Sequence, residues 1–171
     1  MANIEAGEQV LIHGVSGALD QFAIQLAKLR GATVYTTTSA RNTDLVLSLG
    51  ADHAIDYQQV DFSELRDMDV VLDTIGGEVQ DKSWKTIKPG GRLLSIVQTP
   101  DEAVAASHGV TASFYFIEPD RSQLEDMARL ADAGKLIVNI DSEFSLDQVA
   151  DAHEHSESGR AQGKIIINVA C

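Results

Sequence analysis

The sequence predicts an α/β fold: a doubly wound parallel sheet of about six strands, followed by a short C-terminal strand-helix-strand extension. Two observations carry this prediction. Short apolar or β-branched runs alternate along the chain with segments whose apolar residues recur at helical spacing. Glycines follow several of these helical segments, as they do where helices end.

The first half of the chain is predicted to form one βαβαβ unit. An apolar run ends at a glycine, as a buried strand does, and an amphipathic segment follows it. A β-branched run then predicts a second strand, and Gly50 stops a second helix. In chain order, the elements are a strand at 9–14, a helix at 19–27, a strand at 33–38, a helix at 41–49 and a strand at 53–56.

The second half repeats this alternation, so the expected strand order is 3-2-1-4-5-6. A weak helix at 63–66 precedes it, Pro89-Gly90-Gly91 separates a helix from a strand, and Pro119 opens a helix that Gly134 ends. The elements are a strand at 69–74, a helix at 78–87, a strand at 92–97, a helix at 101–107, a strand at 112–116 and a helix at 119–133. The extension adds a strand at 136–141, a helix at 146–158 and a strand at 164–169.

Composition limits the partners and the setting. The chain has 171 residues, with 13 Lys or Arg against 26 Asp or Glu, which gives a net charge of −13 at pH 7. Nucleic acids and anionic membranes bind clustered basic residues, so we expect neither partner. The sequence has no apolar run of membrane-spanning length and no signal peptide at its start, and its single cysteine is Cys171. These features predict a cytoplasmic protein without a disulfide framework.

A glycine-rich turn follows the first predicted strand, at the edge where doubly wound sheets bind ligands. Gly14 permits a tight turn, Gly17 lets the backbone approach a pyrophosphate, and Ser16 lies between them. Ala18 and Leu19 then open a helix whose first N–H groups are free to bind an anion. The pattern predicts a dinucleotide site, and a plain strand-to-helix turn is the alternative interpretation.

Asp20 stands where the third glycine of the dinucleotide fingerprint is expected. Two interpretations remain open. Its carboxylate repels a pyrophosphate or occupies its place, with a repulsion of about 3–4 kcal/mol per pair of unit charges at an effective dielectric near 20. Alternatively, the side chain faces outward and does no harm.

The second predicted strand ends without the acidic residue that bonds to the ribose 2′-OH of NAD. Ser39 and Arg41 stand there instead and can donate hydrogen bonds to a 2′-phosphate, while Tyr57, after the third strand, can flank the same pocket. These residues favour NADP(H) over NAD(H). The alternative makes Ser39 a helix N-cap and Arg41 a solvated residue.

Six short segments occur in order along the chain, at 10–14, 25–28, 50–52, 73–77, 88–93 and 163–167. Together they resemble the medium-chain dehydrogenase/reductase family, in its zinc-independent quinone oxidoreductase branch, from about residue 5 to residue 169. Family members are about twice this long and carry an N-terminal catalytic domain. The resemblance therefore implies an NADP(H)-binding domain at 1–139 and a return segment at 140–171 that belongs to the catalytic domain, so the chain is expected to be a fragment or an engineered piece.

The resemblance also implies where the cofactor lies. The pyrophosphate runs along Gly17, Ala18 and Leu19, and the 2′-phosphate lies among Ser39, Arg41 and Tyr57. The nicotinamide ribose is bordered by Thr74, Ile75 and Gly76, and the ring is approached by Ser95, Val97 and Phe116. Hydride passes directly to a quinone or an enone, so no side chain here is expected to be catalytic.

Two functions follow from these observations. The first is the cofactor domain of an NADPH-dependent quinone or enone oxidoreductase, inactive alone because the substrate domain is missing. The second is a non-catalytic scaffold or interaction module that has lost nucleotide binding through Asp20.

Three further features of the sequence bear on metal binding, catalysis and assembly. His153 and His155 invite a metal site, but residues two apart on a helix face different ways, so we expect no metal. Asp73 is expected to be a buried carboxylate that caps a loop rather than a catalytic acid. The strand at 112–117, if it forms the sheet edge, can pair with its twin in a homodimer.

Overall fold

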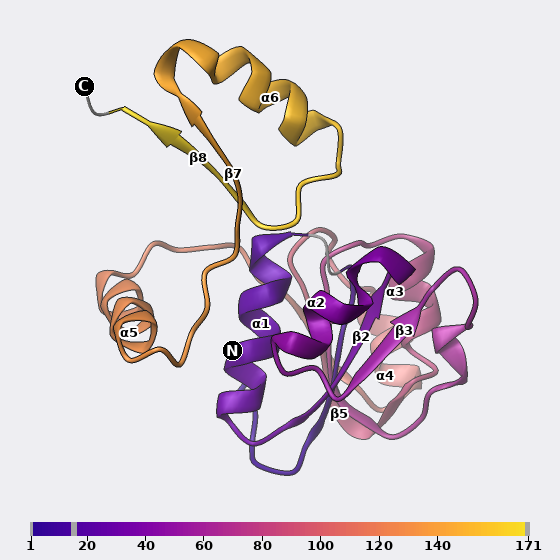
Figure 1. Cartoon of the computed structure of the whole chain (residues 1–171). Helices are drawn as coiled ribbons and strands as arrows, with labels where there is room; N and C mark the ends of the chain where they lie inside the picture. The colour runs from indigo at the N-terminus through magenta and orange to yellow at the C-terminus, as the bar shows by residue number, and fades with distance from the viewer. Residues whose placement is uncertain (1, 15–16, 170–171) are drawn as a thin grey trace.

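The computed structural model describes residues 2–14 and 17–169, and its main feature is a six-stranded parallel sheet (Figure 1). The strand order is β3-β2-β1-β4-β5-β6, which confirms the predicted doubly wound architecture. The strands are β1 (Gln9–Ile12), β2 (Thr33–Thr38), β3 (His53–Asp56), β4 (Met68–Asp73), β5 (Ile87–Ser95) and β6 (Thr111–Phe114).

Helices connect these strands, and a second unit follows them. The connecting helices are α1 (Ala18–Leu29), η1 (Ala40–Asn42), α2 (Thr43–Ser48), η2 (Phe62–Glu64), α3 (Glu78–Ser83) and α4 (Glu102–Ser107). After α5 (Arg121–Asp132), the unit consists of β7 (Ile140–Ser145), η3 (Leu146–Gln148), α6 (Val149–Glu157) and β8 (Lys164–Asn168). The division into domains at 139/140 stays a prediction.

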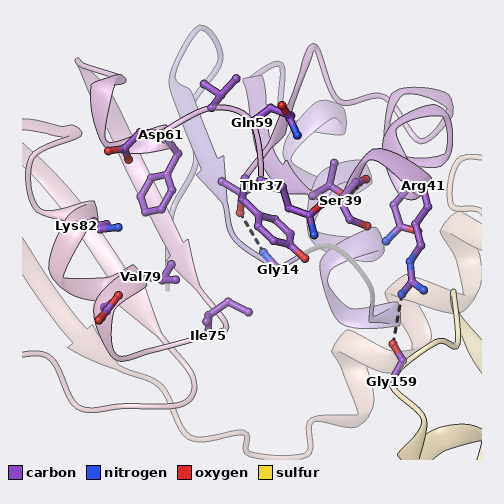
Figure 2. Close-up of a pocket in the computed structure, with 17 residues that line it drawn as sticks. Gly14, Thr37, Ser39, Arg41, Gln59, Asp61, Ile75, Val79, Lys82 and Gly159 are labelled. Atoms are coloured by element: carbon purple, nitrogen blue, oxygen red, sulfur yellow. Dashed lines mark hydrogen bonds between the residues drawn. The ribbon is translucent and has the colours of Figure 1, made fainter.

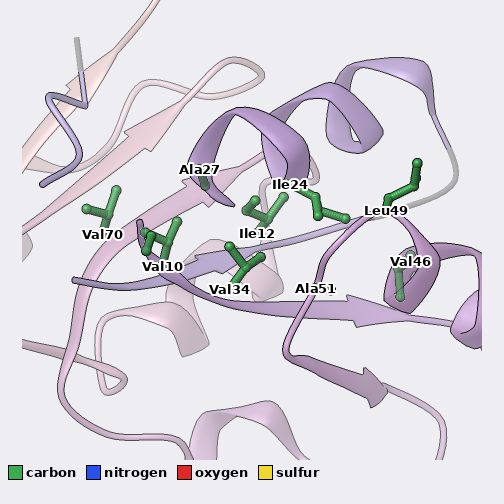
Figure 3. Close-up of a cluster of buried hydrophobic side chains, with 10 residues drawn as sticks. Val10, Ile12, Ile24, Ala27, Val34, Val46, Leu49, Ala51 and Val70 are labelled. Atoms are coloured by element: carbon green, nitrogen blue, oxygen red, sulfur yellow. The ribbon is translucent and has the colours of Figure 1, made fainter. Parts of the chain in front are cut away.

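Two apolar cores lie on opposite faces of the sheet because successive strand residues point to opposite sides. Val10 and Ile12 of β1 pack with Ile24 of α1 and Val46 of α2 on one face (Figure 3). Leu11, between them, packs on the other face with the residues that precede β4 and with α3 and α4. The central strands β1 and β4 are thus covered on both faces, which explains why their sequences contain continuous apolar runs.

β5 begins earlier than the sequence predicts. The expected helix at 78–87 is shorter, and the strand already starts at Ile87, which pairs with Met68 across a shift in register. The Pro-Gly-Gly turn therefore lies within the strand. A Cβ on Gly91 would come within 3.0 Å of the carbonyl oxygen of Asp69, so only glycine fits there.

The C-terminal half differs from the prediction mainly in its boundaries. The strand expected at 136–141 lies at β7, and Leu136 instead packs as a buried residue before it. The helix expected from Pro119 begins after Asp120, whose carboxylate accepts hydrogen bonds from the first turn of α5. The weak helix expected at 63–66 is the single 3-10 turn η2.

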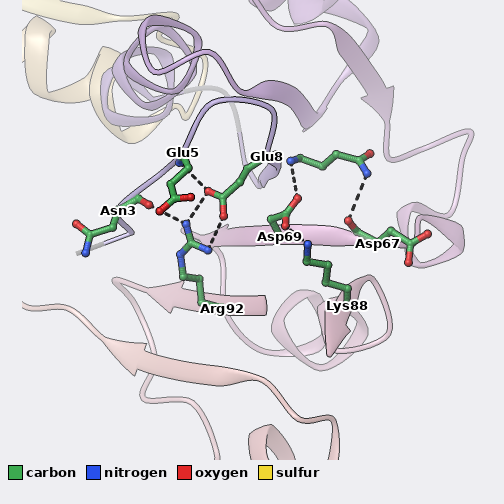
Figure 4. Close-up of polar contacts among 8 residues, drawn as sticks. Asn3, Glu5, Glu8, Asp67, Asp69, Lys88 and Arg92 are labelled. Atoms are coloured by element: carbon green, nitrogen blue, oxygen red, sulfur yellow. Dashed lines mark hydrogen bonds and ion pairs between the residues drawn. The ribbon is translucent and has the colours of Figure 1, made fainter. Parts of the chain in front are cut away.

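Ion pairs close the sheet at its amino end, away from the predicted site (Figure 4). Arg92 of β5 donates to both carboxylate oxygens of Glu8, at 2.8 and 2.7 Å, and this pair lowers the pKa of Glu8. Asp69 accepts from the backbone N–H of Gln9 at 2.8 Å and pairs with Lys88. These contacts tie the start of β1 to β4 and β5.

The second unit is a small parallel β-α-β element at the carboxyl edge of the main sheet (Figure 1). Polar contacts join it to the main body. The side chain of Gln25 bonds to both the N–H and the carbonyl of Ile137, at 2.7 and 3.0 Å, and Gln162 bonds to Asn42. Within the described ranges, no helix has the length and apolarity needed to cross a membrane.

Candidate dinucleotide site

A cavity of about 670 Å³ opens at the carboxyl ends of β1, β2 and β3 (Figure 2). This volume falls within the usual range for small-molecule sites. Its walls come from the turn after β1, the segments after β2 and β3, the start of α3 and one residue near the end of α6. Five of the predicted site residues line it: Gly14, Ser39, Arg41, Tyr57 and Ile75.

Two glycines frame the turn after β1. Gly14 has φ +80°, and a Cβ there would lie 2.5 Å from Cδ1 of Ile75, so the turn packs directly on the end of β4. Gly17 is the N-cap of α1 and provides no side-chain cap, which leaves the first N–H groups of the helix without that partner. The predicted Ser16 lies outside the described residues. The described part of the turn fits an anion-binding helix terminus.

Asp20 points inward, so the interpretation in which it faces outward is wrong. Its side chain is 5% exposed, and Oδ1 has no hydrogen-bond partner among the described residues. Oδ2 would lie 3.4 Å from a Cβ on Gly17. Burial raises the pKa of the Asp20 carboxyl to about 7. Hydrogen bonds from the Thr74 hydroxyl and from the N–H groups of Gly17 and Asp20 lower this pKa, but by less than burial raises it.

The end of β2 brings together the residues predicted to hold a 2′-phosphate. Ser39 does occupy the N-cap position of η1, but its side chain makes no capping hydrogen bond. Arg41 faces the cavity and donates to the carbonyl oxygen of Gly159 at 3.4 Å. Tyr57 is 56% exposed on the same wall. Two donors and a ring therefore share one end of the cavity.

The charged lining residues lie on two opposite walls of the cavity. Figure 2 shows Asp61 and Lys82 on the wall opposite Arg41, and Glu78, the other acidic lining residue, precedes Lys82 by about one turn of α3. Lys82 contributes to lowering the pKa of Asp61, after the hydrogen bonds from Ser63. The Arg41 end thus has no acidic residue among its described lining residues, which suits a phosphate there.

A hydrogen-bonded chain runs beneath the cavity through a buried histidine that the sequence reasoning missed. Gly14 N–H donates to the Thr37 hydroxyl, which lies 3.1 Å from Nδ1 of His13; Nε2 lies 2.9 Å from the Ser83 hydroxyl. Because Ser83 donates its hydroxyl hydrogen to the carbonyl of Val79, Nε2 of His13 carries a proton and donates to the Ser83 oxygen. Burial lowers the pKa of His13 to about 4, so the ring is neutral at pH 7. This series of hydrogen bonds joins the turn after β1 to α3.

Asp73, at the end of β4, is a loop-capping carboxylate, as expected. Oδ1 accepts the N–H groups of Ile75 and Gly76 at 3.0 and 2.8 Å. Oδ2 accepts from Gln80 and from the hydroxyl of Ser95, at 2.8 and 2.9 Å. Ser95 is fully buried and turned to this carboxylate rather than to the cavity.

The other predicted residues lie at the same edge of the sheet but outside the cavity lining. The first turn of α1 contains Ala18 and Leu19, and Leu19 is 40% exposed. Thr74 donates its hydroxyl to the carbonyl of His13. Val97 and Phe116 follow β5 and β6, and both are exposed. The structure therefore brings together the adenosine end of the predicted site more closely than the nicotinamide end.

Several lining residues have no local signal in the sequence. The segment after β3 and the face of α3 form the far wall, and Gly159, which follows α6, lies at least 77 residues along the chain from the others. The one usable signal is the i, i+4 spacing of Glu78 and Lys82, which predicts that these two lining residues share one face of α3. The lining residues not predicted include Gln58, Gln59, Val60, Phe62, Lys82 and Gly159.

One of the two histidines of α6 makes a hydrogen bond with a carboxylate of β7. Nε2 of His155 lies 2.6 Å from Oδ2 of Asp141, while His153 is exposed. Hydrogen bonds from the Gln162 N–H and from His155 lower the pKa of Asp141. Across residues 2–14 and 17–169, no three His, Cys, Asp or Glu side chains are grouped as metal ligands.

Comparisons with known proteins show which family the chain is similar to. The family described as zinc-binding dehydrogenase matches residues 49–167. The chain is 36% identical to 2-methylene-furan-3-one reductase of Solanum lycopersicum, covering 98% of this chain and 42% of that protein. It is 31% identical to NAD(P)H oxidoreductase RTN4IP1, mitochondrial, of Danio rerio, covering 96% and 50%.

Among solved structures, the quinone oxidoreductase from Coxiella burnetii superposes with a TM-score of 0.89 at 32% identity, covering 99% of this chain and 55% of that one. The chain spans about half of the length of the curated relatives named here. The chain belongs to the medium-chain dehydrogenase/reductase family, the zinc-binding dehydrogenases, and corresponds to their cofactor-binding half.

Proposed function

We propose that this chain is the NADP(H)-binding domain of an oxidoreductase that reduces a quinone or an enone. The observation that carries the proposal is the end of β2, where Ser39 and Arg41 line the cavity and Asp61 lies on the opposite wall. The printed names of the relatives support the reaction class, because they include an NAD(P)H oxidoreductase, a furanone reductase and a quinone oxidoreductase.

The residues fit a dinucleotide at three points. The helix terminus at Gly17 offers N–H groups to the pyrophosphate, and the absence of a Cβ on Gly14 keeps the turn close to the sheet. Arg41 and Ser39 donate to the 2′-phosphate, where Arg41 exchanges its bond to the Gly159 carbonyl for a charged acceptor. The bound cofactor supplies the hydride, and these residues hold and orient it.

The 171 residues alone are proposed to have little turnover. The relatives are about twice as long, and the resemblance places their substrate-binding region in the other half. Two further predictions stay predictions: a cytoplasmic setting, and a homodimer paired through β6. β6 lies at the sheet edge with Phe114 41% exposed, and Phe116 and Ile117 beyond it are also exposed.

Calorimetric titration of NADPH and NADH tests the proposal. NADPH is expected to bind more tightly, and Arg41→Ala to weaken NADPH by about 10–100-fold, the worth of one or two hydrogen bonds to a charged group. NADH, which lacks the 2′-phosphate, is expected to be unaffected. Arg30→Ala, an exposed arginine after the last turn of α1, is the matched control. Equal binding of both nucleotides would contradict the NADP(H) site, and binding of neither would favour the scaffold alternative.

A further inference from the structure

The carboxyl of Asp20 is a buried, incompletely bonded acid at the point where the proposed function places a pyrophosphate. It is the N3 residue of α1, and its Oδ2 lies against the N-cap Gly17. Its Oδ1 is buried without a hydrogen-bond partner among the described residues. A buried charge without full compensation is costly, and a second negative charge beside it adds repulsion.

Among the described residues, no charged side chain on the neighbouring elements pairs with the Asp20 carboxyl. At the end of β1, the ring of His13 is neutral and bonds to Thr37 and Ser83. At the end of β4, Asp73 is bonded to its own loop and to β5. On α1 itself, the first basic residue is Lys28 in the last turn, where it pairs with Asp52.

No described charged side chain therefore shifts the pKa of Asp20, which responds to burial, to the Thr74 hydroxyl and to backbone N–H groups. The carboxyl can relieve its burial by taking up a proton, and protonation also replaces a repelling charge with an O–H donor.

We propose that Asp20 makes dinucleotide binding depend on a proton: the carboxyl must be neutral when the pyrophosphate lies on the N-terminus of α1, so binding takes up a proton from solvent and weakens as pH rises. This inference rests on the proposed function and adds a regulatory property to the same site.

The size of the effect follows from the position of the titration. A carboxyl with a pKa of about 7 is mostly neutral at pH 6 and mostly ionised at pH 8. If only the neutral form binds, affinity falls about tenfold between these two pH values. Proton uptake on binding rises from about half a proton at pH 7 toward one proton at pH 8.

The test is calorimetric titration of NADP⁺ into the chain at pH 6, 7 and 8, in buffers of different ionisation enthalpy. The 2′-phosphate of the ligand titrates near pH 6 itself. Asp20→Asn, which stays neutral at every pH, carries the same ligand contribution and is the reference. Asp44→Asn, in the first turn of α2, makes the same charge change at an exposed site and is the control.

The expected result is a wild-type affinity that falls about tenfold more than that of Asp20→Asn, while Asp44→Asn follows the wild type. Parallel profiles for the wild type and Asp20→Asn, with no excess proton uptake, would overturn the proton link and leave the NADP(H) site standing. Binding by none of these proteins at any pH would overturn the proposed function and this inference with it. If Asp20→Asn does not fold, proton uptake by the wild type, measured with NADH to remove the 2′-phosphate, decides the matter.

Discussion

His13 illustrates how burial of a single residue fixes its charge and links stability to pH. The pKa of the ring falls from 6.5 to about 4 in the folded protein, because burial disfavours the cation. Below pH 6.5 the unfolded chain therefore binds more protons than the folded one. The stability that this residue provides is complete above pH 6.5 and is lost as pH falls toward 4, by about 3 kcal/mol.

Replacing His13 by Gln removes this dependence. His13→Gln is expected to be less stable than the wild type at pH 7 by about 1–3 kcal/mol, because Thr37 and Ser83 lose a well-placed partner. The difference is expected to narrow between pH 6.5 and 4, as the wild type loses stability that the variant never had. Urea unfolding at pH 7 and pH 4.5 measures both values, and a constant difference would count against a neutral buried ring.

Among the elements, α5 depends on its cap more than on packing. None of its residues is buried, and Leu124 is 63% exposed. Asp120 accepts hydrogen bonds from the N–H groups of Ser122 and Gln123, at 2.7 and 3.1 Å. Exposed helices of this length are marginal without such caps.

Asp120→Ala is therefore expected to destabilise α5 locally, by about 1 kcal/mol. Hydrogen exchange of the α5 amides should become several-fold faster, while the amides of β1 and β4 keep their rates. Asp132→Ala, in the last helical residue, removes a carboxylate from the unfavourable end of the helix dipole and is the control, expected to leave exchange unchanged or slower. Equal effects of both variants would show that the cap is not what holds the helix.

The sequence was a good guide to the elements whose signals are local. Alternation of strands and helices, and the turn at Gly14, predicted the six-strand order because each depends on residues within one element. The start of β5 at Ile87 was missed because it depends on pairing with Met68 across a shifted register. The sequence does not determine whether the Asp20 side chain points inward, because this depends on how the first turn of α1 packs on the sheet.

At the scale of the whole molecule, the candidate site was predicted in part for the same reason. Ser39 and Arg41 follow one strand and could be recognised by position. The far wall after β3 and on α3, and Gly159 after α6, meet them only through the tertiary fold. The sequence places Ser95 near the nicotinamide ring, and only the structure reveals that its hydroxyl donates to Asp73.

The two parts of the chain are expected to unfold at different free energies. Nearly all buried apolar residues belong to the six-stranded sheet and its helices, whereas the β7-α6-β8 unit contributes only Ala152 among the described residues. Segments with few buried apolar contacts open at lower free energy than the core. Amides of β7 and β8 should therefore exchange faster than those of β1 and β4 in native-state hydrogen exchange.

Gln25 of α1 holds the β7-α6-β8 unit against the main body through its side-chain amide, so replacing it tests this attachment. It is buried, and it bonds to both backbone groups of Ile137, just before β7. Gln25→Ala is expected to speed exchange in β7 and β8 by about 5–30-fold, the equivalent of about 1–2 kcal/mol, and to leave β4 within twofold of the wild type. Gln123→Ala, an exposed glutamine on α5, is the matched control. A common increase across β4, β7 and β8 would mean that the unit opens only with the whole molecule. Because Gly159 of this region lines the cavity, independent opening would also expose the Arg41 end of the site.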